Sequence, residues 1–253
     1  MSPTTVHHRH VALKMALKRA VELGIIVKNP ADFTQPPRPH RPEIRVLCET
    51  EVATLLKALE GTPAALVGFL GLMTGARLGE LLALRWSDLD LDSQMMYVRQ
   101  TLIERPGGRD GKVWYAFKEP KSGKGRSVDL DAGTVAKLKA HRKAQAETRL
   151  RLGLGWAALD LVITNTVGEP VRLSTASAHF RTVARAADFD GLRFHDTRHT
   201  HATILLKTGV PPHVVSKRLG HSSVAFTLQV YSWVLPGQQR DAAEGFAAAV
   251  CAK

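Results

Sequence analysis

The chain has 253 residues, with 35 Lys and Arg against 23 Asp and Glu and a formal net charge of +12 at pH 7. This length allows one large or two small domains with a sizeable core. Only two cysteines, Cys48 and Cys251, are present, which excludes a disulfide-dense secreted scaffold. No apolar run is long enough to cross a membrane and no secretory signal is visible, so we expect a cytoplasmic protein. The positive charge favours a polyanionic partner such as nucleic acid.

The N-terminal part predicts one helix followed by a stiff linker. Apolar residues recur at helical spacing over His10–Val27, and Gly24 lies where a helix ends. The linker, residues 29–45, contains five prolines and favours an extended backbone. Residues 1–45 carry eight Lys and Arg against three Asp and Glu, a net of +5. We therefore predict three segments: a helix in residues 1–28, a basic linker in 29–45 and the main domain in 46–253.

The main domain predicts a mainly α fold with one small antiparallel β-sheet, an α+β class. Thr50 precedes a predicted helix over Glu51–Leu59, Pro63 starts another, and Arg77–Arg85 continues as helix. Three strands are predicted to form one sheet: Met95–Thr101, Val113–Phe117 and Arg126–Leu130. The rest reads as helices with one short strand, Leu161–Thr164. These helices are Ala132–Arg149, Ser174–Ala187, Asp196–Lys207, Pro211–Leu219, Ser223–Ser232 and Gly237–Val250.

The strand region is strongly basic. From Arg105 to Arg126 there are seven Lys and Arg against two Asp and Glu. A hairpin with this charge can reach a phosphate backbone, and we predict that Lys118, Lys124 and Arg126 contact DNA. The charge pattern is equally compatible with a solvated edge hairpin whose lysines prevent edge-to-edge aggregation.

Four short strings place polar residues in otherwise apolar surroundings. They are TGARLGE at 74–80, PKSGKGR at 120–126, HDTRH at 195–199 and LGHSS at 219–223, and Tyr231 follows ten residues after His221. Each also has a purely structural explanation. Arg77 could simply pair with Glu80, and Lys121 could be a solvated charge. His195 and Arg198 could form a structural pair. His221, after Gly220, could cap a helix end, and Tyr231 could be a core residue.

Taken together and in chain order, these strings resemble the tyrosine recombinase (phage integrase) family. The resemblance covers about residues 45–240, the family's catalytic domain. The matching text is TGARLGELLALRWSDLDL, PKSGKGR, FHDTRHTHAT, LGHSS and the YSWVLP around the tyrosine. The family implies cleavage and rejoining of DNA strands through a 3′-phosphotyrosine bond, without a metal or other cofactor.

The resemblance implies a role for each matched residue in phosphodiester chemistry. Arg77 and Arg198 would stabilise the negative charge that builds on the phosphate, because guanidinium groups form forked, charge-assisted hydrogen bonds. Tyr231 would be the nucleophile and Lys121 the general acid for the leaving 5′-oxygen. His195 would accept or relay the tyrosine proton.

Two further matched positions complete the predicted site. His221 would donate a hydrogen bond to the phosphate, and Glu80 would brace the site. The cluster of His195, His199 and His201 raises the possibility of a metal site. Asp196 follows the first of these, where the zincin pattern requires Glu, so no metal is predicted, and His199 and His201 are assigned to packing or hydrogen bonding.

Compared with complete family members, this sequence has little before the linker. Only one helix precedes the prolines, and it resembles the last helix of a core-binding domain. Expected partners are double-stranded DNA, further copies of the chain in a homotetramer on DNA, and an accessory DNA-bending or directionality protein as a further candidate. Two different functions stay open: a truncated, non-catalytic DNA-binding remnant and a topoisomerase IB-like strand transferase. A C-terminal helix completes the predicted domain.

Overall fold

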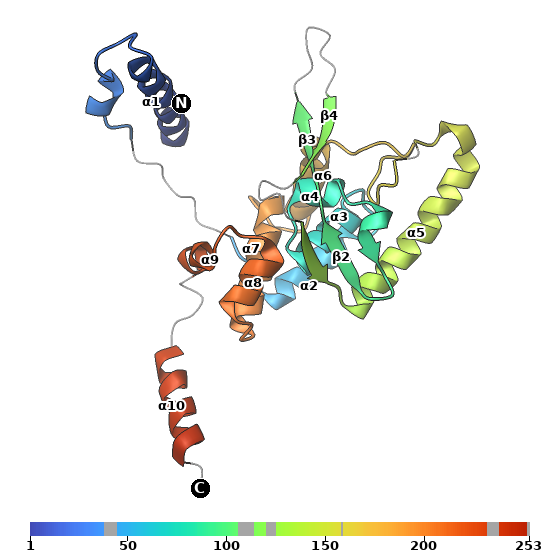
Figure 1. Cartoon of the computed structure of the whole chain (residues 1–253). Coiled ribbons are helices and arrows are strands. Elements are labelled where there is room, and N and C mark those ends of the chain that lie inside the picture. The colour runs from blue at the N-terminus through green and yellow to red at the C-terminus, as the bar shows by residue number, and fades with distance from the viewer. Residues whose placement is uncertain (38–44, 106–113, 120–124, 158, 232–237, 252–253) are drawn as a thin grey trace. The chain divides into compact units, whose positions relative to one another are not determined.

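The computed structural model describes residues 1–37, 45–105, 114–119, 125–157, 159–231 and 238–251. The chain divides into two compact units, Met1–Ile44 and Arg45–Lys253, each of which is described by itself (Figure 1). Within the described ranges, no helix combines the length and the apolar character needed to cross a membrane.

The first unit contains a longer helix than the sequence predicted. Helix α1 covers Pro3–Glu22, so the expected start at His10 was seven residues too late and the expected end too far along. The side chain of Ser2 accepts a hydrogen bond from the backbone N–H of Thr5 at 3.2 Å. Pro3 suits the first helical position, where its missing N–H costs nothing. The helix start is therefore set by a cap and a proline rather than by the apolar pattern.

The segment expected to be extended begins with a turn. Pro30–Phe33 forms the 3₁₀ helix η1. The side chain of Asn29 accepts a hydrogen bond from the N–H of Ala31 at 2.9 Å and donates one to the carbonyl of Lys14 at 3.0 Å. This one side chain both starts the turn and ties it to α1, which explains the departure from an extended chain.

The second unit begins with three helices: α2 (Glu49–Leu59), α3 (Ala65–Thr74) and α4 (Leu78–Leu82). Helix α2 starts two residues earlier than predicted, because the N–H of Cys48 donates to the Glu51 carboxylate at 2.8 Å and caps the helix there. The helix expected over 77–85 is only one turn and is followed by η2 (Trp86–Asp88).

The strands form two sheets where one was expected. β1 (Leu89–Asp90), β2 (Met95–Val98) and β5 (Arg126–Asp129) form an antiparallel sheet in the order β1-β2-β5. β3 (Thr101–Arg105) and β4 (Trp114–Lys118) pair separately. The single strand predicted over 95–101 was therefore wrong.

The break between β2 and β3 has a tertiary cause. The side-chain amide of Gln100 donates to the carbonyl of Ala83 at 2.8 Å, just after α4. This contact fixes the chain between Val98 and Thr101 on the end of a helix, so β3 leaves the direction of β2. Figure 1 shows the β3–β4 pair projecting away from the other strands.

The remaining elements are helical, so the predicted mainly α class with a small antiparallel sheet is confirmed. The strand expected over 161–164 is absent from the described elements; Leu161 and Thr164 make only isolated bridges, to Arg85 and Pro170. The helices are α5 (Ala132–Leu152), η3 (Gly153–Gly155), α6 (Leu173–Ala186), α7 (Phe194–Lys207), α8 (Pro212–Leu219), α9 (Val224–Tyr231) and α10 (Gln238–Cys251).

Close packing of α3 on α7 sets the centre of this unit. A Cβ on Gly71 would lie 2.6 Å from the ring of Phe194, so only glycine allows this approach. A second, smaller apolar cluster joins α7, α8 and α9; it contains Ala202, Leu206, Val215, Leu219 and Tyr231. Figure 1 shows α7, α8 and α9 on the side of this unit opposite α5. Three of the four polar strings therefore lie at the α3–α4 turn, on α7 and at the end of α8, and Tyr231 ends α9. Residues 120–124 of the fourth string lie outside the described residues.

Candidate active site

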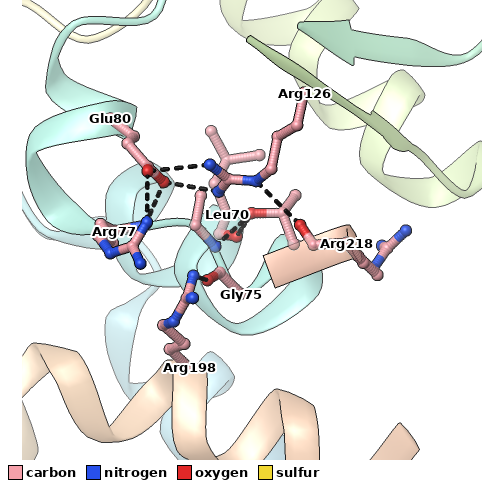
Figure 2. A network of polar contacts seen from close by, with 9 residues as sticks. Leu70, Gly75, Arg77, Glu80, Arg126, Arg198 and Arg218 are labelled. Atoms are coloured by element: carbon pink, nitrogen blue, oxygen red, sulfur yellow. Dashed lines mark hydrogen bonds and ion pairs between the residues drawn. The ribbon is translucent and has the colours of Figure 1, made fainter. Parts of the chain in front are cut away.

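Glu80 lies between two arginines at the start of α4. Its carboxylate accepts hydrogen bonds from the backbone N–H and the guanidinium of Arg77, at 2.8 and 2.9 Å. The guanidinium of Arg126, from β5, donates to both carboxylate oxygens, at 2.9 and 2.7 Å (Figure 2). Burial alone would raise the pKa of Glu80, but the hydrogen bonds and charges of Arg126 and Arg77 lower it to about 2. Glu80 therefore stays ionised and fixes both arginines.

Arg126 is held by protein groups on every side of its guanidinium. Its Nε donates to the carbonyl of Arg218 at 2.9 Å, in addition to the two bonds to Glu80. Its side chain is 13% exposed. The predicted contact of Arg126 with DNA stays a prediction, whereas in this structure the residue joins β5 to α4 and to the end of α8.

A glycine allows this approach of Arg126. Gly220 ends α8 with φ +67, and a Cβ there would lie 2.9 Å from Cδ of Arg126 and 3.0 Å from its Nη1. Another residue type would be strained by the backbone and would also push Arg126 away. The glycine in LGHSS therefore serves the Glu80 network as well as the helix end.

Arg198 reaches the same region from α7 and is buried, with 2% of its surface exposed. Its Nη1 donates to the carbonyl of Gly75 at 2.9 Å, where Gly75 ends α3 with φ +65 (Figure 2). Its Nη2 is buried and has no hydrogen-bond partner among the described residues. Burial, with the charges of Arg77 and Arg126, lowers the pKa of Arg198 to about 9. Nη2 of Arg198 is therefore a buried donor that an anion can satisfy.

Helix α7 carries three histidines in different surroundings. His195 is exposed. His199 lies with Nδ1 2.9 Å from the hydroxyl of Tyr231, and its ring packs edge-on against that of His195 with centroids 4.9 Å apart. Nδ1 of His201 lies 2.8 Å from the carbonyl of Leu72, and its Nε2 accepts from Arg218 at 3.0 Å. His199 and His201 are therefore used in hydrogen bonds, as predicted.

His221 lies in the turn before α9, and Tyr231 is the last residue of α9. Nδ1 of His221 lies 2.7 Å from the hydroxyl oxygen of Thr227, and its ring stacks on that of Tyr231 with centroids 6.5 Å apart. Burial and the charges of Arg198 and Arg77 lower the pKa of His221 to about 3. Tyr231 is 1% exposed, and burial raises the pKa of its phenol to about 12 although the charge of Arg198 opposes this. Both groups are neutral at neutral pH.

Residues 45–236 match the sequence pattern of the phage integrase family. The chain belongs to this family. The family match and the predicted strings cover the same region, so the resemblance stated from the motifs is confirmed.

Curated relatives carry the same family identity. The chain is 30% identical over 257 residues to a "Tyrosine recombinase XerC-like" protein of Caldanaerobacter subterraneus, covering 96% of this chain and 66% of that protein. It is 29% identical to an "Integrase" of Streptomyces ambofaciens, covering 91% of this chain and 60% of that protein. The chain thus spans about three fifths to two thirds of the length of these relatives.

Solved structures of integrases share the fold. The Tn1549 transposon integrase in complex with a circular intermediate DNA gives a TM-score of 0.79 at 21% identity, over 98% of this chain and 80% of that chain. A lambda integrase tetramer bound to a Holliday junction gives a TM-score of 0.55 at 21% identity, over 87% of this chain and 57% of that chain.

The site of this phage integrase family member combines most of the predicted residues. The structure brings Arg77, Glu80, Arg198, His221 and Tyr231 into one region, and charge interactions link Arg198 to both Arg77 and Tyr231. Lys118 is exposed on β4, and Lys121 and Lys124 lie outside the described residues.

Sequence reasoning missed the contact between His199 and the tyrosine. One signal was available: His199 lies four residues after His195 and so shares its helix face. In the sequence alone, that spacing suggests a metal site rather than a contact with the phenol.

Proposed function

We propose that this chain cleaves and rejoins DNA strands through a phosphotyrosine bond at Tyr231. The observation that carries the proposal is the buried guanidinium of Arg198, whose Nη2 has no partner among the described residues while the phenol of Tyr231 lies close enough to interact with its charge. An unpaired buried cation beside a nucleophile suits a substrate that carries a phosphate.

The proposed chemistry follows from charge development. As the phenol oxygen attacks phosphorus, negative charge builds on the non-bridging oxygens. Arg198 and Arg77 are proposed to hold that charge, and one such fixed donor is worth roughly 3 kcal/mol of transition-state stabilisation. Glu80 keeps Arg77 in place. Lys121 as general acid and His221 as a donor to the phosphate are further proposals carried over from the family motif.

The phenol of Tyr231 and the guanidinium of Arg198 are both buried. Tyr231 is 1% exposed and Nη2 of Arg198 is also buried, so a phosphate reaches these two groups only after a neighbouring segment moves. The phenol of Tyr231 lies on α9 beside His199 of α7. We therefore propose that the movement that admits the phosphate leaves this contact in place.

A covalent capture experiment tests the proposal without knowledge of the target sequence. The purified chain is mixed, in excess chelator, with random-sequence duplexes that each carry one 5′-bridging phosphorothiolate at the centre. Sulfur leaves without needing an acid, and the released thiol rejoins poorly, so the adduct accumulates. We expect a DNA–protein adduct that survives denaturation and is lost in Tyr231→Phe.

Two different outcomes would redirect the proposal. DNA retained on filters without any covalent adduct would indicate a non-catalytic DNA-binding protein. Adducts together with relaxation of a supercoiled plasmid, but without joining of two captured sites, would indicate a topoisomerase-like enzyme.

Assembly on DNA is a separate proposal. We propose that copies of this chain act as a homotetramer on duplex DNA, in line with the lambda integrase tetramer on a Holliday junction. Mass measurement by light scattering with the captured duplex tests this; a monomer at saturating DNA would refute it. An accessory protein stays a prediction from the sequence.

A further inference from the structure

The group that touches the phenol of Tyr231 is His199. The hydroxyl oxygen lies 2.9 Å from Nδ1 of His199, and the two rings are 5.8 Å apart between centroids. His195, predicted from the sequence to take the tyrosine proton, packs against His199 with 4.9 Å between ring centroids. His199, not His195, is therefore the imidazole within hydrogen-bond distance of the nucleophile.

We propose that His199, through Nδ1, is the acceptor of the Tyr231 proton during strand cleavage. This inference rests on the proposed function. In the step, the phenol O–H bond breaks and the proton forms an N–H bond on His199. The electron pair stays on the phenol oxygen, which bonds to phosphorus. The P–O5′ bond then breaks, and the leaving oxygen keeps that bond's electron pair and takes a proton from the general acid, for which Lys121 is proposed.

The protonation states of the resting site fit this role. Burial, followed by the charge of His195, lowers the pKa of His199 to about 4, so the imidazole is neutral at neutral pH and Nδ1 can accept. The phenol is the stronger acid of the two neutral groups and so is the donor in this hydrogen bond. A buried phenol with a pKa of about 12 does not ionise without an adjacent acceptor.

The charges around His199 connect its basicity to DNA binding. Helix α7 contributes two cationic or titratable neighbours and one anion, and its N-cap contributes a third cation. Two more groups come from α9 and the turn before it. These neighbours are His195, Arg198, Arg193, Asp196, Tyr231 and His221. The charges of His195 and Arg198 make the imidazolium form of His199 unfavourable in this structure. A phosphodiester beside Arg198 brings a negative charge that offsets them, so the proton moves when substrate is present.

The substitution His199→Asn separates hydrogen bonding from proton acceptance. The Asn side chain places a polar atom near the position of Nδ1 but takes no proton at neutral pH. His199→Leu removes both functions and approximates the volume. His213→Asn, on the exposed start of α8, is the matched control. Thermal melting and filter binding of DNA confirm that each variant folds and binds.

The assay measures single-turnover formation of the covalent adduct on a duplex captured by the wild-type chain. We expect the rate to fall on the order of 100-fold in His199→Asn and His199→Leu, the usual contribution of a general base, with unchanged DNA affinity. The defect persists on the 5′-phosphorothiolate duplex, because a good leaving group replaces an acid but not a base. A group acting on the leaving oxygen would instead be rescued on that duplex.

The pH profile separates a base from a structural residue. In the variants the rate rises about tenfold per pH unit between neutral and mildly alkaline pH, because phenolate must form by reaction with hydroxide. The wild-type rate stays level over that range. A wild-type rate in His199→Asn, a flat profile in both variants, or full rescue by phosphorothiolate would overturn the proposal. These results leave the proposed function standing if Tyr231→Phe abolishes the adduct; absence of the wild-type adduct would reject both.

Discussion

Replacing Glu80 by glutamine tests whether one carboxylate organises the arginines of the site. Glu80 is 7% exposed and accepts two hydrogen bonds from each of Arg77 and Arg126. Its pKa falls from 4.5 to about 2 on folding. A depression of this size corresponds to about 3 kcal/mol of stability. Glutamine keeps the shape and loses the charge, so we expect Glu80→Gln to lower the free energy of unfolding by about that amount at pH 7.

The sign of the pH dependence follows from the lowered pKa. Because the unfolded carboxyl titrates near 4.5 and the folded one near 2, the stabilisation is fully present above about pH 5. It is lost as the pH falls from 4.5 toward 2. The stability difference between wild type and Glu80→Gln is therefore expected to be constant from pH 7 to pH 5 and to narrow below that.

Urea unfolding followed by circular dichroism measures both effects. Glu147→Gln, an exposed carboxylate on α5, is the matched control and should leave stability unchanged. If Glu80→Gln changed the free energy of unfolding at pH 7 by less than about 0.5 kcal/mol, the range of an ordinary surface substitution, the carboxylate would not be what organises the arginines.

Three further outcomes are expected. In urea unfolding, Gly220→Ala should lower the free energy of unfolding more than Gly209→Ala. Both glycines have positive φ, where alanine costs about 1 kcal/mol, but only at Gly220 would the Cβ also meet Arg126, adding about 1–3 kcal/mol. Equal losses would contradict the packing argument. Arg198→Ala and Arg77→Ala should each reduce covalent adduct formation by about 100-fold or more while the melting transition is retained, and wild-type rates would remove that residue from the site. The free energy of unfolding should also fall as pH drops from 6.5 toward 4. Burial lowers the pKa of His201 to about 4, so over this range the unfolded state binds more protons than the folded state. In urea unfolding, His201→Gln should make the free energy of unfolding depend less on pH between 6.5 and 4.

The sequence predicted the fold class, and it pointed to residues that the structure brings together in the candidate site, because both depend on local patterns. Apolar residues at helical spacing marked the helices, and glycines marked several of their ends, as at Gly75 and Gly220. The motif strings placed Arg198 and Tyr231 in the site although they are 33 residues apart in sequence. Such motifs are readable because the chemistry requires particular residue types in a fixed order.

Tertiary contacts account for what the sequence did not predict. The strand expected over 95–101 breaks because Gln100 donates to the carbonyl of Ala83, a contact that no strand propensity encodes. Arg126 was predicted to bind DNA from charge alone, and charge does not distinguish an exposed cation from one paired with a buried carboxylate. Its partner, Glu80, lies 46 residues away, and only the folded arrangement brings the two together.

The energetics of Arg198 connect its burial to the proposed activity of the chain. Burying a guanidinium with one nitrogen unpaired costs free energy, and the nearby charges of Arg77 and Arg126 add to that cost. The fold bears this cost because α7 and the hydrogen bond to the Gly75 carbonyl hold Arg198 in place. A phosphodiester that reaches this site relieves both the missing hydrogen bond and the repulsion between arginines. Binding of the phosphate is therefore coupled to the interaction that is proposed to stabilise it during the reaction, next to the phenol of Tyr231.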